Sequence, residues 1–103
     1  MENIEQINNW LVAGKQIGKS FSFDRDGAKY WSSVGVQKWG STYKVYIDEI
    51  LESKMDSEEY EKEVIKEIDD VDKIYEFIKN NSCISLLDLK PCKGQKIFNP
   101  AFD

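Results

Sequence analysis

Residues Ala13 to Ser20 read AGKQIGKS, which has the spacing of a phosphate-binding P-loop. In that motif backbone amides hold the phosphates, the lysine reaches the terminal ones and the hydroxyl holds magnesium. The chemistry requires a buried strand before the loop and a helix after it, because the helix N-terminus supplies amides and a dipole. Here a helical pattern precedes the match and a strand pattern follows it. We therefore interpret the segment as a loop between helix and strand, flexed by Gly14 and Gly18.

Two other segments contain residue types that bind metal ions, but neither has the full set of ligands. The stretch DRDG, Asp24 to Gly27, resembles the start of a calcium loop, but its twelfth position is Gly35, where that loop requires glutamate. A hairpin turn is the better interpretation. Cys83 and Cys92 are too few for a zinc site in a chain without histidine, so we expect free thiols. The missing histidine also removes the commonest general base, so we expect no catalytic residue, cofactor or metal.

The elements that position these residues begin with a helix. The chain of 103 residues is 41% hydrophobic and 13% aromatic, which indicates one globular domain over residues 1–103. Its apolar runs are too short for a membrane span or a signal-peptide core, and we expect a cytoplasmic protein without membrane contact. An amphipathic helix is predicted over residues 2–12, where apolar side chains recur at helical spacing at Ile4, Ile7, Trp10 and Leu11.

From residue 20 the period of the pattern changes to two. The segments SFSFD, AKYWSSVGVQKW and TYKVYIDEI predict three strands joined by turns at DRDG and at Gly40–Ser41. In the third strand Tyr43, Val45 and Ile47 share one face, and the alternate positions Lys44, Tyr46 and Asp48 share the other. The fold class is α+β: an antiparallel meander over about residues 20–50, packed with a short N-terminal helix and one or two C-terminal helices.

After Ile50 the pattern is helical. Asp56 with Glu59, or Ser57, is a candidate N-cap, and Asp69–Asp70 lie where one long helix or two joined helices would continue. The prediction covers residues 57–79 and ends at Asn80–Asn81–Ser82; it depends on the spacing of Tyr60, Val64, Ile68, Val71, Tyr75 and Ile78. The following CISLLDL is a candidate strand. The final KIFNPAFD is expected to dock through its apolar side chains, Ile97, Phe98 and Phe102.

Charge is unevenly distributed along the chain. From Asp48 to Glu76 there are thirteen acidic residues and four lysines, a net charge of −9 within a chain of net charge −5. Residues 1–47 and 77–103 are each mildly basic. A solvated helix face is one interpretation. The alternative, which we weigh equally, is a partner surface, because a charge surplus creates a field that repels nucleic acid and attracts basic proteins.

The three tryptophans, Trp10, Trp31 and Trp39, could stack on sugars or bases. Burial in the core is their more common role, because each removes a large apolar area from water. Trp39 lies beside the Gly40–Ser41 turn, and we expect it to be the most exposed of the three.

Taken together, these features resemble the small immunity proteins of bacterial contact-dependent growth inhibition and related polymorphic toxin systems. The resemblance rests on chain length, the meander FSFDRDGAKYWSSVGVQKWGSTYKVYIDEI, the acidic helical stretch and the terminal KIFNPAFD. It implies a cognate toxin domain, a basic nuclease whose active site the immunity protein occludes. A ribonuclease is the class implied, with an RNase A-like fold as one possibility.

The expected partner contacts are exposed carboxylates with two aromatic anchors, in a protein that is monomeric when free and binds no nucleic acid. The residues predicted are Trp39, Tyr46, Asp48, Glu49, Glu52, Asp56, Glu58, Glu59, Glu63, Asp69, Asp70 and Asp72.

Three rival functions stay open at this point. A nucleic-acid mimic that inhibits a DNA-binding host protein would spread its carboxylates along an elongated face. A small histidine-free enzyme would need a cleft that holds a carboxylate or thiol with a displaced pKa. A structural module would self-associate without any partner.

Overall fold

A computed structural model describes residues 2–57, 59–92 and 97–99. Two residues that entered the predictions, Glu58 and Phe102, lie outside these ranges. Five strands form one antiparallel sheet in the order β4-β3-β2-β1-β5. The elements along the chain are α1 (Glu2–Val12), β1 (Ile17–Arg25), β2 (Ala28–Trp39), β3 (Thr42–Leu51), the 3-10 helix η1 (Glu52–Lys54), β4 (Tyr60–Ile68), α2 (Val71–Asn81), the 3-10 helix η2 (Leu86–Asp88) and β5 (Lys90–Pro91).

The N-terminal half matches the prediction closely. Helix α1 and the three-strand meander are confirmed, and the DRDG stretch forms a hairpin turn in which Asp26 and Gly27 have φ angles of 52° and 78°. Positive φ at both central positions suits the right-handed twist of the flanking strands. The P-loop match begins in the turn that follows α1 and ends in the first residues of β1, with helix before and strand after. That order is the one predicted from sequence.

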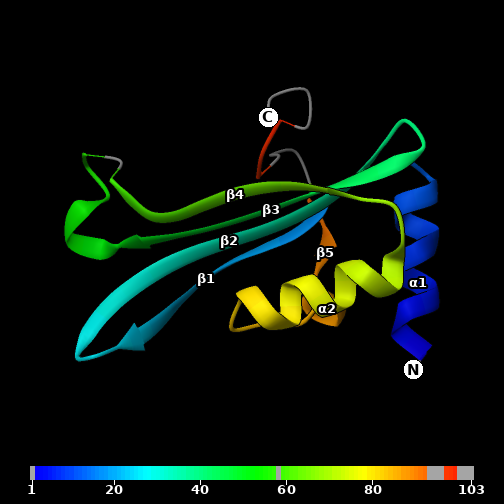
Figure 1. Ribbon diagram of the computed structural model, residues 1–103. Coiled ribbons are helices and arrows are strands. Elements are labelled where there is room, and N and C mark those ends of the chain that lie inside the picture. Colours follow the sequence, from blue (N-terminus) through cyan, green and yellow to red (C-terminus); the bar gives the residue numbers. More distant parts are fainter. Residues whose placement is uncertain (1, 58, 93–96, 100–103) are drawn as a thin grey trace.

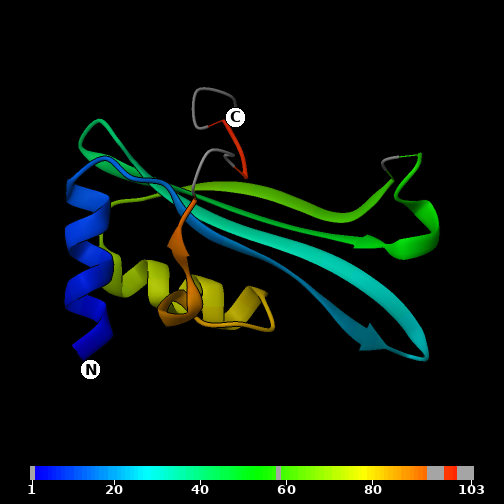
Figure 2. The ribbon, with the colours of Figure 1, turned by 180° about the vertical axis from the view of Figure 1, so that it is seen from behind.

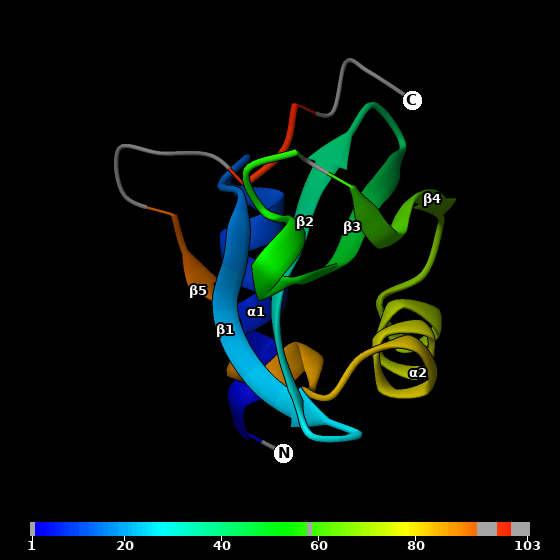
Figure 3. The ribbon, with the colours of Figure 1, turned by 90° about the vertical axis from the view of Figure 1, so that its left-hand side faces the viewer.

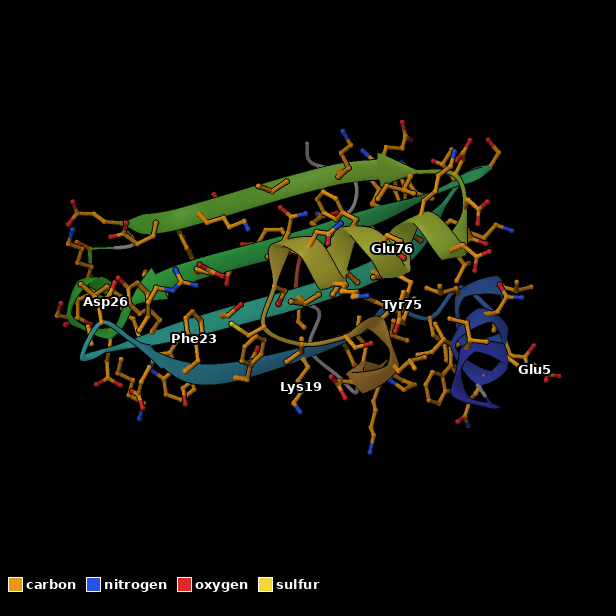
Figure 4. All side chains as sticks on the ribbon, turned by 60° about the horizontal axis from the view of Figure 1, so that its bottom comes forward. Glu5, Lys19, Phe23, Asp26, Tyr75 and Glu76 are labelled. Atoms are coloured by element: carbon orange, nitrogen blue, oxygen red, sulfur yellow. The ribbon has the colours of Figure 1, made fainter. Side chains whose placement is uncertain are left out.

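Both helices lie on the same side of the sheet and near one of its ends (Figure 1; Figure 2 shows the reverse view). We call this side the helix face. The core forms there from Ile7, Leu11, Ile74 and Ile78 of the helices against the fully buried strand residues Ile17, Val34, Val36, Val45 and Ile47. The sheet continues well beyond α2, and Phe23 lies on this uncovered part (Figure 4). In the part of the chain that is described, no helix is both long and apolar enough to cross a membrane.

Segment 97–99 lies on the opposite side of the sheet, which we call the outer face (Figure 3). Phe98 is 7% exposed and stacks on Tyr46, with ring centroids 5.5 Å apart and an interplanar angle of 9°. Docking of Ile97 and Phe98, predicted from sequence, is therefore confirmed. The sheet has a notch beneath them, because a Cβ atom on Gly35 would lie 3.0 Å from the Phe98 ring and one on Gly18 would overlap Ile97.

Gln16 holds the backbone of this segment through its side-chain amide. Its Oε1 accepts hydrogen bonds from the backbone N–H of Ile97 (2.6 Å) and Phe98 (3.4 Å), and its Nε2 donates to the Phe98 carbonyl (3.0 Å). Gln16 is 5% exposed, so these bonds are largely shielded from water. The prediction that Gly18 flexes a loop is wrong, since Gly18 lies within β1 and gives room to a distant segment.

The helical prediction for residues 57–79 is wrong over its first half. Residues Tyr60–Ile68 form the edge strand β4, paired with β3. Val64 and Ile68 are four residues apart, and an even spacing keeps side chains on one face of a strand as well as of a helix. Tyr60 lies beyond a β-bulge and pairs with Ile50. No helix begins at Asp56 or Ser57, because the Ser57 hydroxyl bonds the Lys54 carbonyl and Glu59 in a turn.

Only the second half of that stretch is helical. Helix α2 ends at Asn81 with Ser82 as C-cap, as predicted. The candidate strand CISLLDL is also wrong, because Ser85 caps η2 through a capping box with Asp88 and the strand β5 that follows has two residues. Both cysteines are free, Cys83 exposed and Cys92 half-buried.

Asp70 is the N-cap of α2, and its Oδ1 accepts a hydrogen bond of 2.8 Å from the Asp72 backbone N–H. Asp70→Ala is expected to lower the free energy of unfolding by about 1 kcal/mol, because this amide loses its partner. Urea denaturation measures the loss. Asp70→Asn keeps the capping oxygen and should lose much less. Equal losses in the two variants would contradict the capping role and attribute the effect to charge.

Candidate functional site

Exposed carboxylates line one long edge of the molecule. They come from η1 and the turn after it, from strand β4 and from the turn into α2, which follow one another along the edge in Figure 1. We call this set the acidic edge: Glu52, Asp56, Glu59, Glu61, Glu63, Glu67, Asp69, Asp70 and Asp72. Strand β4 alone, with nine residues, spans about 30 Å at about 3.3 Å per residue. The carboxylates are therefore spread over most of the longest dimension, 38 Å.

Strand β4 separates its charges by sign. Glu63 pairs across the strands with Asp48 and Glu67 with Lys44, all on the outer face. The lysines of β4 alternate with these glutamates and point to the helix face, where the Lys62 Nζ donates a 2.7 Å hydrogen bond to the Asn81 carbonyl near the end of α2. A cation suits that position, because helix C-terminal carbonyls carry partial negative charge. The β4 lysines therefore do not neutralise the neighbouring glutamates.

Three predicted contact residues are not exposed, which corrects the sequence analysis. Asp48 is 7% exposed, Glu49 6% and Tyr46 7%. Tyr46 and Asp48 lie on the outer face of β3, where Phe98 covers Tyr46. Glu49 lies on the helix face, at an alternate position to Val45 and Ile47, and is buried there beside Arg25.

The buried carboxylates each have defined partners. Glu49 accepts a hydrogen bond of 3.2 Å from Arg25, and this contact raises the pKa of the Arg25 guanidinium. The Asp48 Oδ1 accepts from the Ser33 backbone N–H at 2.7 Å, and its Oδ2 lies 2.8 Å from the Tyr46 hydroxyl. Both residues are therefore integrated into the sheet rather than presented to a partner.

Of the remaining predicted residues, Glu63 lies on β4 in the middle of the edge, and the other described carboxylates lie at its two ends. Glu52, Asp56 and Glu59 are exposed at the end beyond the helices, where the Glu52 Oε2 also accepts a 2.9 Å hydrogen bond from the Trp31 indole. At the other end the turn into α2 carries Asp69, Asp70 and Asp72. Trp39, at the tip of the β2–β3 hairpin, is 42% exposed, which confirms the expected exposure.

Sequence reasoning missed two members of the edge, Glu61 and Glu67. The Glu67 Oε2 accepts a hydrogen bond of 2.8 Å from the Thr42 hydroxyl, and Glu61 lies 3.8 Å from the Lys54 ammonium. The alternation of Tyr60, Lys62 and Val64 was the available signal for a strand. With that assignment, the glutamates at odd positions would have been placed together.

A polar cavity of about 550 Å³ lies on the helix face between the end of α2 and the uncovered part of the sheet. Arg25, Glu49, Lys62 and Cys83 are among its lining residues. The enzyme hypothesis requires a displaced carboxyl or thiol pKa in such a cleft. Burial raises the pKa of Asp48 and of Cys92, but neither residue lines this cavity. Among the described residues, no group of three or more cysteines and acids is arranged to hold a metal ion.

Asp48→Asn is expected to stabilise the protein at neutral pH by up to about 1 kcal/mol, because it removes one of two like charges directly opposite across β3 and β4. The pKa of Asp48 is raised chiefly by burial, so the native state binds more protons than the unfolded chain between about pH 4 and that raised pKa. Stability from this group is present at the acid end and is lost as pH rises through the raised pKa. The advantage of Asp48→Asn should therefore grow with pH.

Denaturation by urea at about pH 4.5, 6 and 8 measures this trend. Asp24→Asn, at an exposed position of the same sheet, serves as the control for removing a carboxylate that is not buried. A difference for Asp48→Asn that is constant across the range, or a loss of stability at about pH 8, would contradict the prediction.

Comparisons of the chain with protein-family models, with curated proteins and with solved structures find no match.

Proposed function

We propose that this protein is a binding protein that neutralises a basic partner domain, in the manner of an immunity protein acting on its cognate nuclease toxin. The single observation that carries the proposal is the separation of charge on β4. Glu63 and Glu67 lie on the outer face while Lys62 and Lys66 lie on the helix face, so a strong negative potential faces solvent along one edge.

Few of these carboxylates have an ion-pair partner. Among the described residues, three members of the acidic edge, Glu52, Glu61 and Asp69, lie within 4 Å of a lysine ammonium. In these pairs the side chains are between 45% and 68% exposed, and such exposed pairs contribute little to stability. Concentrating like charges costs stability through self-repulsion. Binding to a basic partner accounts for the concentration of carboxylates, since nuclease clefts that bind phosphate are basic.

The acidic edge also has suitable dimensions for a protein partner. A typical interface buries about 800 Å² on each side, with aromatic anchors inside a polar rim. The edge extends about 30 Å along β4 and has exposed aromatic side chains near both ends, Trp39 at 42% and Tyr60 at 42%. These rings supply apolar contact beside the carboxylates, which steer the encounter.

The experiment is co-expression of this protein with the product of the gene immediately upstream. We expect a large secreted protein that ends in a small basic domain. That domain should copurify with this chain, and its toxicity in cells should disappear when this chain is present. Copurification without loss of toxicity, or no complex at all, would contradict the proposal.

The extended line of carboxylates also favours a second candidate, a nucleic-acid mimic that binds a DNA-binding protein. On the outer face of β4, Glu63 and Glu67 are four residues apart, or about 13 Å, and the line of carboxylates follows one edge as a nucleic-acid backbone would. The two functions differ in specificity. An immunity protein binds only its cognate domain, whereas a mimic would bind a DNA-binding protein and be displaced from it by duplex DNA of any sequence.

A further inference from the structure

The hydroxyl group of Tyr46 lies between two carboxyl groups. It is 2.8 Å from the Asp48 Oδ2 and 2.9 Å from the Glu63 Oε2, and both distances are those of hydrogen bonds. A phenol has one proton and can donate to one of these oxygens only. The second short contact needs a proton on a carboxyl group, which then donates to the phenol oxygen.

Loss of the phenol proton does not explain the two short contacts. Burial, together with the neighbouring Asp48 and Glu63, raises the pKa of Tyr46 far above its ordinary value, so the hydroxyl stays protonated. Asp48 is fixed from its other side by the Ser33 N–H at 2.7 Å. Glu63, by contrast, is exposed on the edge strand and can leave. Of the two carboxyl groups that contact Tyr46, Asp48 is therefore fixed and Glu63 is the one whose side chain can move.

Among the residues that the structure describes, few compensating charges lie near the pair. On the outer face, β3 contributes Lys44 and β4 contributes Glu67, which are opposite each other in the register. Glu49, next in sequence to Asp48, adds a further negative charge that raises the Asp48 pKa. The positions of β2 that face the pair are uncharged, with Ser33 opposite Asp48 and Gly35 opposite Tyr46. The ring of Phe98 covers Tyr46 without adding charge.

We propose that Asp48 and Glu63 hold one proton between them through the Tyr46 hydroxyl, and that losing this proton releases the Glu63 side chain from the sheet. In the protonated state one carboxyl donates to the phenol oxygen and the phenol donates to the other carboxylate. On deprotonation the proton passes to water, and the phenol keeps a single acceptor. Asp48 retains that bond because Ser33 holds it, and Glu63 swings into solvent with a full negative charge.

This switch goes beyond the proposed function and does not depend on a partner. It makes the charge of the acidic edge respond to pH at one position near the middle of β4. Below the transition Glu63 is held against Tyr46; above it, the edge gains one mobile carboxylate.

The test is a carbon-13 NMR titration of the side-chain carboxyl carbons of the free protein, from about pH 3 to about pH 9. Burial raises the pKa of Asp48, so its carboxyl carbon should show a titration step above the ordinary value of about 4. Nuclear Overhauser contacts between the Glu63 methylenes and the Tyr46 ring should be present below this Asp48 step and lost above it.

Two variants separate the bridge from general electrostatics. Tyr46→Phe removes the hydroxyl and should abolish the pH dependence of the contacts between Glu63 and ring 46, whereas Glu67→Gln, on the same strand and face, should leave it unchanged. If Tyr46→Phe does not fold, Asp48→Asn provides the second test, because an amide keeps its proton and the Glu63–Tyr46 contacts should then persist at all pH values. An Asp48 step at its ordinary value in the wild type, or wild-type contacts that persist at all pH values, would overturn the proposal.

Discussion

Phe98→Ala is expected to lower the free energy of unfolding by about 3 kcal/mol, since a buried aromatic ring is lost and its site cannot collapse. The ring is 7% exposed, stacks on Tyr46 and fills the notch above Gly35. The notch floor is the backbone of two paired strands, at the Gly18–Gly35 register position, and these glycines have no side chain that could fill the space left by the ring. Equilibrium denaturation in urea measures the loss.

Val12→Ala is the matched control for removing an apolar side chain, because Val12 is 60% exposed. Its loss should be within about 0.5 kcal/mol of zero. Phe98→Leu fills part of the notch and should fall between the two. A Phe98→Ala loss as small as that of Val12→Ala would mean that segment 97–99 does not contribute to stability.

Reversing Asp56, Glu59 and Glu67 to lysine is expected to slow association with the basic partner about tenfold or more at low salt. The three residues are exposed and spread along the acidic edge, so the variant inverts much of the field that steers the encounter. The association rate should also lose most of its dependence on ionic strength between about 0.02 M and about 0.5 M, because screening acts on that field. Stopped-flow measurements give both quantities.

The control carries the same change in net charge at exposed positions outside the edge, with Glu5, Asp24 and Glu76 replaced by lysine. It should retain most of the wild-type rate and salt dependence. Equal slowing by the two variants would show that net charge alone matters, and an unchanged rate in the edge variant would remove the acidic edge from the interface.

The N-terminal half of the fold could be predicted because local patterns decide it. Turn residues with positive φ at Asp26, Gly27 and Gly40 separate strands of regular alternation, and each strand pairs with its neighbour in sequence. Residues 60–68 could not be assigned in the same way. Their apolar side chains fit both periods, and the strand forms because β3 offers it a pairing edge.

The sequence indicated that the candidate site is acidic, but it did not indicate which of the acidic side chains are exposed. The acidic stretch was visible as a charge surplus, and nine of its carboxylates do line the edge. Asp48 and Glu49 are exceptions because residues distant in sequence cover or pair with them. Gln16 and Phe98 meet across 82 positions of sequence, and no local pattern indicates such a contact.

The large separation in sequence between the meander and Phe98 has a consequence for the order of folding. The meander brings Gly18 opposite Gly35 through contacts between neighbours in sequence, which form early because loop closure is short. The groove over these glycines cannot be filled until Phe98 has been synthesised, about 60 residues after Gly35. On the ribosome the sheet therefore forms with Tyr46 uncovered, and segment 97–99 seats last. Until then the nascent chain exposes the Tyr46 ring and the groove over Gly18 and Gly35, both of which segment 97–99 covers in the finished protein.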